Sequence, residues 1–270
     1  MKPSRYRFRL ALVIAGLGAT VLTSAQAALA EPAAPIPAVV ESRTQTPVAG
    51  QSLALEGADN ARDIGGYTTV DGAVVRSGSV FRTDALNNLT PRDLARLESA
   101  NVTVVDDLRT TYERVLAPDR VPAGASANWY DVLGQSPITT LVDMPASYRA
   151  FVTGPGANEA FSAVLHDVAT SEGAVIYHCS AGKDRTGWAT AVLLTILGVP
   201  RDTVNADFLL SNTYRGADPE NPGLNGVSLE WLDIAFDTAT ATYGSFDNYV
   251  SEGLGLSSAD VDLLKSTLLR

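Results

Sequence analysis

The sequence predicts an α/β fold with a central, mostly parallel sheet flanked by helices. The apolar run Ala174–Tyr177 is typical of a buried strand, and Trp188–Leu197 is apolar almost all round and predicts a buried helix that ends at Gly198. Only the ten residues His178–Gly187 separate these two segments. We therefore expect a short loop at the end of a strand that leads directly into the N-terminus of a buried helix.

This loop, His178–Gly187, has the features of an oxyanion site above a thiol. Backbone N–H groups at a helix N-terminus converge on one point, where the helix dipole adds partial positive charge. Arg185 lies six residues after Cys179 and can pair two oxygens of a phosphate group. The same field favours the thiolate form of a cysteine, which is a nucleophile for phosphoryl transfer. The loop is not a Walker A motif, because Asp184 follows Gly182-Lys183 where that motif has Ser or Thr.

The spacing Cys-x5-Arg-Thr, preceded by His, resembles the signature loop of protein tyrosine phosphatases. The fuller form His-Cys-x-x-Gly-Lys-Asp-Arg-Thr-Gly resembles the atypical bacterial branch of that family, whose loop is also similar to that of phosphoinositide phosphatases. The resemblance implies a cysteine-phosphatase-like fold in which Cys179 is the nucleophile and Arg185 binds phosphate. It also implies that the rest of the loop binds substrate through Ser180, Ala181, Gly182, Lys183 and Thr186.

Two further segments resemble the same family. The turn-rich stretch Asn60–Tyr67 contains Arg62, which we expect near the pocket as a substrate-binding residue, although an ordinary turn before a strand is the alternative. Asp107 and Arg109 match an Asp-Leu-Arg at the end of the predicted strand Val102–Val105, where open α/β sheets bind ligands. The alternative there is an Asp that caps the turn with Arg109 as its ion-pair partner.

A phosphomonoester hydrolase needs an acid to protonate the leaving group. Asp184 is our first candidate for this acid and Asp107 the second, because the Trp-Pro-Asp loop of ordinary tyrosine phosphatases is absent. Thr186 is expected to donate its hydroxyl to the sulfur. No metal or other cofactor is expected, since the sequence has two His and no ligand cluster.

The remaining elements follow from capping and periodicity. Thr90-Pro91 with Asp93 begins one helix, and Ser257 with Asp260 begins the C-terminal helix. In residues 134–156, the apolar side chains recur at helical spacing, which predicts either a mobile helical lid or insertion, our preferred interpretation, or a packed surface helix. Further strands are expected at Val74–Arg82, as an edge strand or part of a hairpin, and at Asn128–Val132. Further helices are expected at Tyr112–Leu116, Asn158–Ala169, Asp202–Tyr214, Trp231–Thr242 and Phe246–Gly253.

The pattern of residues 1–30 predicts a secretory signal peptide rather than a membrane span. A basic start precedes the apolar stretch Leu10–Leu22, and small-residue cleavage sites end at Ala27 and Ala30, the latter preferred. An uncleaved anchor is the alternative. Residues 31–50, rich in Ala and Pro, predict a disordered lead-in, and 51–270 a single phosphatase domain.

Charge and cysteine content restrict the function further. Residues 1–30 hold four of the 20 Lys and Arg residues and no acidic residue, so a cleaved chain would keep 16 basic against 30 acidic groups. This argues against a nucleic-acid partner. Cys179 is the single cysteine, so an intramolecular disulfide is excluded even though the signal peptide predicts export.

Together these features predict a secreted hydrolase that acts on phosphotyrosine through a phosphocysteine intermediate. Phosphoserine, phosphothreonine and phosphoinositides are further candidate substrates, and stable membrane insertion after cleavage is not expected. The alternatives are a rhodanese-like sulfurtransferase, which also places a cysteine in an anion-binding loop, and a catalytically silent phosphate-binding module.

Overall fold

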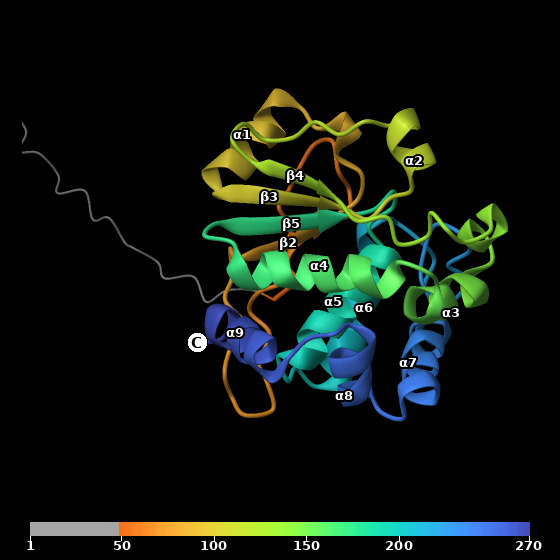
Figure 1. Ribbon diagram of the computed structural model, residues 1–270. Helices are drawn as coiled ribbons and strands as arrows, with labels where there is room; N and C mark the ends of the chain where they lie inside the picture. Colours follow the sequence, from red (N-terminus) through yellow and green to blue (C-terminus); the bar gives the residue numbers. More distant parts are fainter. Residues whose placement is uncertain (1–48) are drawn as a thin grey trace, which may run out of the picture. The chain divides into compact units, whose positions relative to one another are not determined.

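A mixed five-stranded sheet forms the centre of the computed structural model, which describes residues 49–270 (Figure 1). The strand order is β1-β2-β5-β3-β4; β1 is antiparallel to β2, and the other neighbours are parallel, which confirms the mostly parallel sheet. The strands are β1 Arg62–Asp63, β2 Val80–Thr83, β3 Val102–Asp107, β4 Ser126–Trp129 and β5 Ala174–His178. The signal peptide and residues 31–48 of the expected lead-in lie outside the described residues.

Helices cover both faces of this sheet. The α-helices are α1 Pro91–Ser99, α2 Thr111–Leu116, α3 Met144–Thr153, α4 Ala157–Thr170, α5 Arg185–Ile196, α6 Arg201–Tyr214, α7 Leu229–Tyr243, α8 Phe246–Asn248 and α9 Ser258–Leu268. Short turns of other helix types are η1 Leu86–Asn88, η2 Ile138–Leu141 and η3 Tyr249–Gly253. Within residues 49–270, no helix has the length and hydrophobicity that a membrane span requires.

The alternation of side chains along β5 divides the interior into two cores. Val175 and Tyr177 belong to the larger core, which they share with α3 to α9, whereas Ala174 and Ile176 belong to a smaller core under α1. Successive side chains of a strand point to opposite faces, so a central strand buried on both sides must be apolar throughout. This explains why β5 reads as a continuous apolar run.

Helix α5 begins earlier than its apolar pattern indicated. It starts at Arg185, three residues before Trp188, and nearly every side chain along it is buried. Asp184 is its N-cap residue but makes no side-chain capping bond. The first amides of α5 are therefore not capped by that side chain and lie where the loop ends.

Two expected strands are shifted. Within Val74–Arg82 only the last part joins the sheet, as β2, and it lies between β1 and β5 instead of at an edge; Val75 forms an isolated bridge with Leu269. The strand expected at Asn128–Val132 is β4, which ends at Trp129 because it pairs with β3 only as far as Asp107. Val132, beyond it, turns into the core.

The segment 134–156 contains a packed helix. Tyr148 and Phe151 of α3 are fully buried, and α3 lies against α7, where the Tyr148 and Trp231 ring centroids are 6.3 Å apart. This arrangement fits the surface-helix alternative, with α3 forming one wall beside the loop. The capping boxes expected at Thr90 and Ser257 are both present.

Candidate active site

The signature loop connects the carboxyl end of β5 to the first turn of α5. Cys179 directly follows β5, and its side chain is buried at 2% exposure. Gly182 has φ +64°, and a Cβ there would lie 2.5 Å from the backbone of Thr83 and Asp84. Glycine is therefore required at this position, both by its backbone conformation and by its close contact with the end of β2.

Arg185 is held by a residue that the sequence did not indicate. Its Nη1 and Nη2 atoms lie 2.7 and 2.6 Å from the two carboxylate oxygens of Glu113 on α2, and Ser180 also donates its hydroxyl to Glu113. Burial alone would raise the pKa of Glu113, but the hydrogen bonds and charge of Arg185 outweigh this effect and lower it to about 2. The carboxylate thus fixes the guanidinium group beside the loop. The capping-box pattern Thr110-x-x-Glu113 marks the start of α2 but does not reveal this partner.

Asp184 faces the wall formed by α3 and α7. Its Oδ1 atom accepts a hydrogen bond from Tyr148 Oη at 2.9 Å, and Lys183 Nζ lies 2.8 Å from its Oδ2. Lys183 is buried, with its ammonium 5.7 Å from the centre of the Trp231 ring. Burial, the Asp184 carboxylate and the charge of Cys179 raise the pKa of Tyr148 well above its usual value, so the phenol keeps its proton and acts as a donor.

Asp107 occupies the place expected at the end of β3, but its carboxylate is engaged by arginines. Arg109 donates to it from Nε at 2.9 Å and from Nη2 at 2.8 Å, and Arg114 Nε lies 3.2 Å away. Asp107 also accepts from the Arg109 amide, which is the turn-capping arrangement. The geometry therefore agrees with the alternative in which Arg109 is the ion-pair partner of Asp107.

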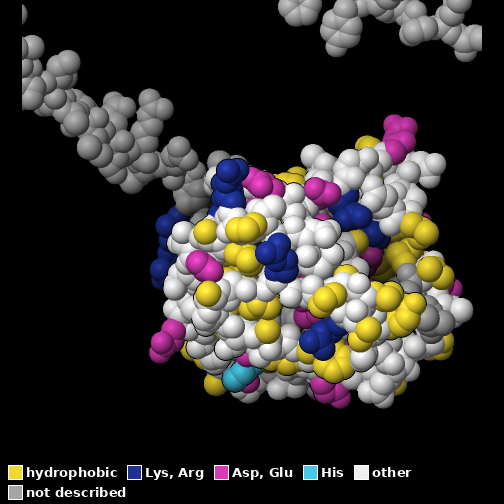
Figure 2. Space-filling model, turned by 90° about the horizontal axis from the view of Figure 1, so that it is seen from above, with side chains coloured by type: hydrophobic (Ala, Val, Ile, Leu, Met, Phe, Trp, Pro, Cys, Tyr) yellow, Lys and Arg dark blue, Asp and Glu magenta, His cyan; other side chains and the backbone are white. Residues whose placement is uncertain are grey.

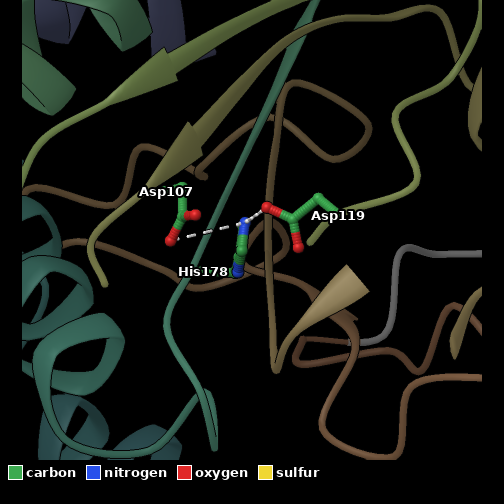
Figure 3. Close-up of side chains that lie close together, drawn as sticks. All are labelled: Asp107, Asp119 and His178. Carbon is green, nitrogen blue, oxygen red and sulfur yellow. Dashed lines mark ion pairs between the residues drawn. The ribbon is translucent and has the colours of Figure 1, made fainter. Parts of the chain in front are cut away.

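Asp107, Asp119 and His178 form a cluster that residue spacing did not indicate (Figure 3). One potential ligand atom of each lies within 4.8 Å of the others, and His178 Nε2 is 3.1 Å from Asp119. However, Arg109 Nη2 lies 2.8 Å from a carboxylate oxygen of both Asp107 and Asp119. The guanidinium already supplies the positive charge that a metal ion would bring.

The structure places Arg62 differently from the expected substrate contact. Its side chain is fully buried, Nε lies 3.2 Å from Asp207 on α6, and Nη1 lies 2.5 Å from Asn60 Oδ1. Asn60 in turn donates to the carbonyl of Gly182 at 3.0 Å. Arg62 therefore lies beneath the loop, where it supports Asn60 rather than facing a bound substrate.

Thr186 is also buried, in the first turn of α5. Its hydroxyl oxygen has no hydrogen-bond partner among the described residues, which is uncommon for a buried hydroxyl. The Thr186 carbonyl accepts a hydrogen bond from the side-chain hydroxyl of Thr190. An unpaired hydroxyl is thus available close to the start of the helix.

Comparison with known proteins decides the family. The model of the tyrosine phosphatase family matches residues 53–270, which is most of the chain. The chain belongs to the tyrosine phosphatase family. This confirms the resemblance of the signature loop and establishes a protein-tyrosine-phosphatase-like enzyme, which decides against the sulfurtransferase alternative.

Several known phosphatases are similar to this family member. A Cupriavidus necator protein named as a tyrosine-protein phosphatase is 29% identical over 261 residues, covering 85% of this chain and 91% of that protein. The triple specificity protein phosphatase PtpB of Mycobacterium tuberculosis is 29% identical over 279 residues, covering 80% of this chain and 98% of PtpB. Among solved structures, that of Pseudomonas aeruginosa TpbA aligns with a TM-score of 0.34 and 15% identity, covering 62% of this chain and 90% of TpbA.

In this tyrosine phosphatase, helix α2 presents different chemistry on its two sides. Glu113 binds Arg185 on the inner side, whereas Tyr112, Val115 and Leu116 are 63%, 75% and 67% exposed. Figure 2 looks down onto the side of the molecule where α2 and β4 lie in Figure 1, and hydrophobic side chains gather on part of this face. The short helix that fixes the arginine is therefore itself open to solvent.

Proposed function

We propose that this chain is an exported phosphatase that hydrolyses phosphotyrosine through a phosphocysteine intermediate. The observation that carries the proposal is the position of the signature loop. Cys179 lies at the end of β5, and the uncapped N-terminus of α5 and the fixed guanidinium of Arg185 lie beside it. Membership in the tyrosine phosphatase family supports the same chemistry.

The first step transfers the phosphoryl group to sulfur. The Cys179 thiolate attacks phosphorus, the P–S bond forms as the bond to the tyrosyl oxygen breaks, and that oxygen leaves with a proton. Loop amides and Arg185 stabilise the three equatorial oxygens. The Thr186 hydroxyl, which has no partner among the described residues, donates a hydrogen bond to the sulfur during this step.

Asp184 is the acid that we propose for this proton. Its side chain is 18% exposed, whereas that of Asp107 is 4% exposed and is paired with two arginines. Tyr148 and Lys183 both donate to Asp184, so the carboxyl group must replace one of these donors with a proton before the step, and it passes that proton to the tyrosyl oxygen as this leaves. In the second step the P–O bond to water forms as the P–S bond breaks, and the Asp184 carboxylate takes a proton from that water. Inorganic phosphate leaves, and the thiolate and the acid are restored.

The buried position of Lys183 bears on substrate choice. A second cation at the rim would favour multiply phosphorylated lipids, but this ammonium is paired with Asp184 beneath Trp231. Phosphotyrosine is therefore our proposed main substrate. One relative is named a triple specificity phosphatase, so phosphoserine, phosphothreonine and phosphoinositides belong in the test panel.

The central experiment measures phosphate release from peptides carrying each phosphoresidue and from phosphoinositides, with Cys179→Ser as control. We expect phosphotyrosine to be hydrolysed fastest and the control to be inactive. Acid quenching during turnover should trap a phosphoryl group on the single cysteine. Turnover without that adduct, or equal turnover by Cys179→Ser, would refute the mechanism.

The acid is identified by comparing Asp184→Asn with Asp107→Asn. Losing the true acid slows substrates with poor leaving groups far more than those with good ones, because only the former need the proton. We expect this selective loss for Asp184→Asn. An equal slowing of both substrate types would remove Asp184 from the role.

Export is tested on the same gene product. The first 30 residues support a cleaved signal peptide, with Ala30 as preferred site and Ala27 as second. Mass spectrometry of protein from the culture medium should give an N-terminus at residue 31 or 28. A full-length chain retained in the cell would contradict this proposal.

A further inference from the structure

Two arginines lie side by side beneath the signature loop, around a single carboxylate. Arg62 and Arg82 are direct neighbours in the β1–β2 ladder, and both are fully buried. Asp207 of α6 lies between them, 3.2 Å from Arg62 Nε and 2.8 Å from Arg82 Nη1. Like charges opposite one another in a sheet repel, so Asp207 is what allows the two guanidinium groups to share this space.

This buried cluster of Arg62, Arg82 and Asp207, together with the adjacent Asn60, binds two carbonyl groups of the loop. Arg82 Nη2 donates to the Gly182 carbonyl at 2.8 Å, and Asn60 Nδ2 donates to the carbonyls of Gly182 and Ala181 at 3.0 and 3.2 Å. In a trans peptide the C=O and the following N–H point in opposite directions. Fixing these carbonyls therefore fixes the amides of Gly182 and Lys183, which point away from the cluster.

The cluster also carries excess positive charge. Asp207 contributes one negative charge against the two of Arg62 and Arg82, and all three side chains are at most 2% exposed. Arg82 Nε has no hydrogen-bond partner among residues 49–270. A buried, incompletely paired charge is costly unless another anion lies nearby, and an anion bound in the loop would be that partner.

We infer that Arg82, together with Arg62 and Asp207, forms a buried positioning centre that orients the loop amides and strengthens anion binding in the loop. These residues do not touch the substrate; they act through Gly182 and through their net charge. The inference rests on the proposed function, since it concerns the same loop. It adds residues from β1, β2 and α6 to a site that the signature motif alone does not describe.

The test uses two substitutions that change the charge of the centre in opposite directions, with inorganic phosphate as the probe in titration calorimetry. Arg82→Gln removes the excess positive charge, and Asp207→Asn increases it while keeping nearly the same shape. A unit charge acting over roughly 10 Å at an effective dielectric constant of about 20 changes affinity on the order of tenfold. We expect phosphate to bind about tenfold more weakly to Arg82→Gln and severalfold more tightly to Asp207→Asn.

A purely structural role predicts a different pattern. Both substitutions disturb a buried network, so loss of structure alone would weaken phosphate binding in both variants. That result, or no change in either, would overturn the inference. If Arg82→Gln does not fold, Asp207→Asn still tests the inference, because tighter phosphate binding by this variant is expected only from its added positive charge.

Further variants separate positioning from charge. Arg82→Lys keeps the charge but cannot contact both Asp207 and Gly182 as the planar fork does, so we expect its phosphate affinity to lie between those of Arg82→Gln and the unaltered chain. Arg201→Gln, at the start of α6, removes an exposed ion pair with Asp233 of α7; it is the matched control and should bind phosphate normally. An affinity of Arg82→Lys equal to that of Arg82→Gln would exclude the charge contribution.

The two proposals fail in distinguishable ways. If the unaltered chain binds phosphate but does not hydrolyse phosphotyrosine, the proposed function fails and the binding comparison is unaffected. If the chain hydrolyses phosphotyrosine but the two charge variants shift affinity together, the positioning centre fails. Iodoacetamide alkylation of the single cysteine at a fixed pH gives a second readout, expected to be slower in Arg82→Gln than in Asp207→Asn.

Discussion

The ion pair between Glu113 and Arg185 gives the sharpest test of how this site is held together. Glu113→Gln keeps the shape of the side chain but removes its charge, leaving a buried guanidinium group without its carboxylate. Both contacts are shorter than 2.8 Å, and the two side chains are 17% and 8% exposed. Such bidentate, charge-assisted pairs are among the stronger hydrogen-bonded interactions in proteins.

The expected loss of stability follows from the pKa of Glu113, which is lowered from its usual 4.5 to about 2. A shift of this size corresponds to about 3 kcal/mol, which partial exposure to solvent reduces to about 2 kcal/mol. Because the folded-state pKa is depressed, this stabilisation is fully present above pH 4.5 and is lost as the pH falls towards 2. The difference between the original chain and Glu113→Gln should therefore be constant near neutral pH and shrink by about half near pH 3.

The assay is urea unfolding across this pH range, combined with kcat/KM for phosphotyrosine hydrolysis at pH 7. Loss of the fixed guanidinium orientation should lower kcat/KM by about 10- to 100-fold. Asp260→Asn is the matched control, since Asp260 has the same capping-box position in α9 without an arginine partner. A stability loss no larger than that of the control, or one independent of pH below 4.5, would refute the argument; so would an unchanged kcat/KM.

Three further predictions follow from the same structure. Gly182→Ala should lose at least about 2 kcal/mol of stability and most phosphate binding, because φ is +64° and the added Cβ would collide with backbone atoms. Gly72→Ala is the control, since Gly72 has φ +83° but open space around the Cβ position. Equal losses in the two variants would contradict the close-contact argument. Tyr148→Phe removes the donor to Asp184 and should cost about 1 kcal/mol in unfolding free energy while lowering kcat; an unaltered kcat would separate Tyr148 from the acid. Burial and the neighbouring Asp167 raise the pKa of Asp106 from its usual 3.8 to about 8, so the carboxyl group increasingly favours the unfolded chain as the pH rises from about 4 to 8. Asp106→Asn should therefore gain about 1–3 kcal/mol more at pH 8 than at pH 4. Unfolding curves at the two pH values check this last prediction, and a gain that is the same at both would rule it out.

Local signals explain why much of the fold could be predicted. The buried strand β5, the capped starts of α1 and α9, and the apolar helix α5 each depend on residues close together in sequence. The strands Val74–Arg82 and Asn128–Val132 were shifted because strand ends depend on the partner strand. The register of β4 against β3, for example, is set across the sheet and is not marked by residues near Trp129.

The sequence by itself determined the signature loop and hence the chemistry that we propose. Cys179, Arg185 and Thr186 lie within eight residues of one another, and helix dipole, amides and thiol follow from a strand that leads into a helix. Tertiary structure decided what holds that loop. Glu113, Tyr148 and Arg82 reach it from three other elements, at sequence separations of 36 to 100 residues. Asp207 of α6 in turn pairs with Arg82, 125 residues away in sequence. No local pattern encodes such contacts, because buried charges find their partners only when distant segments are brought together by the core.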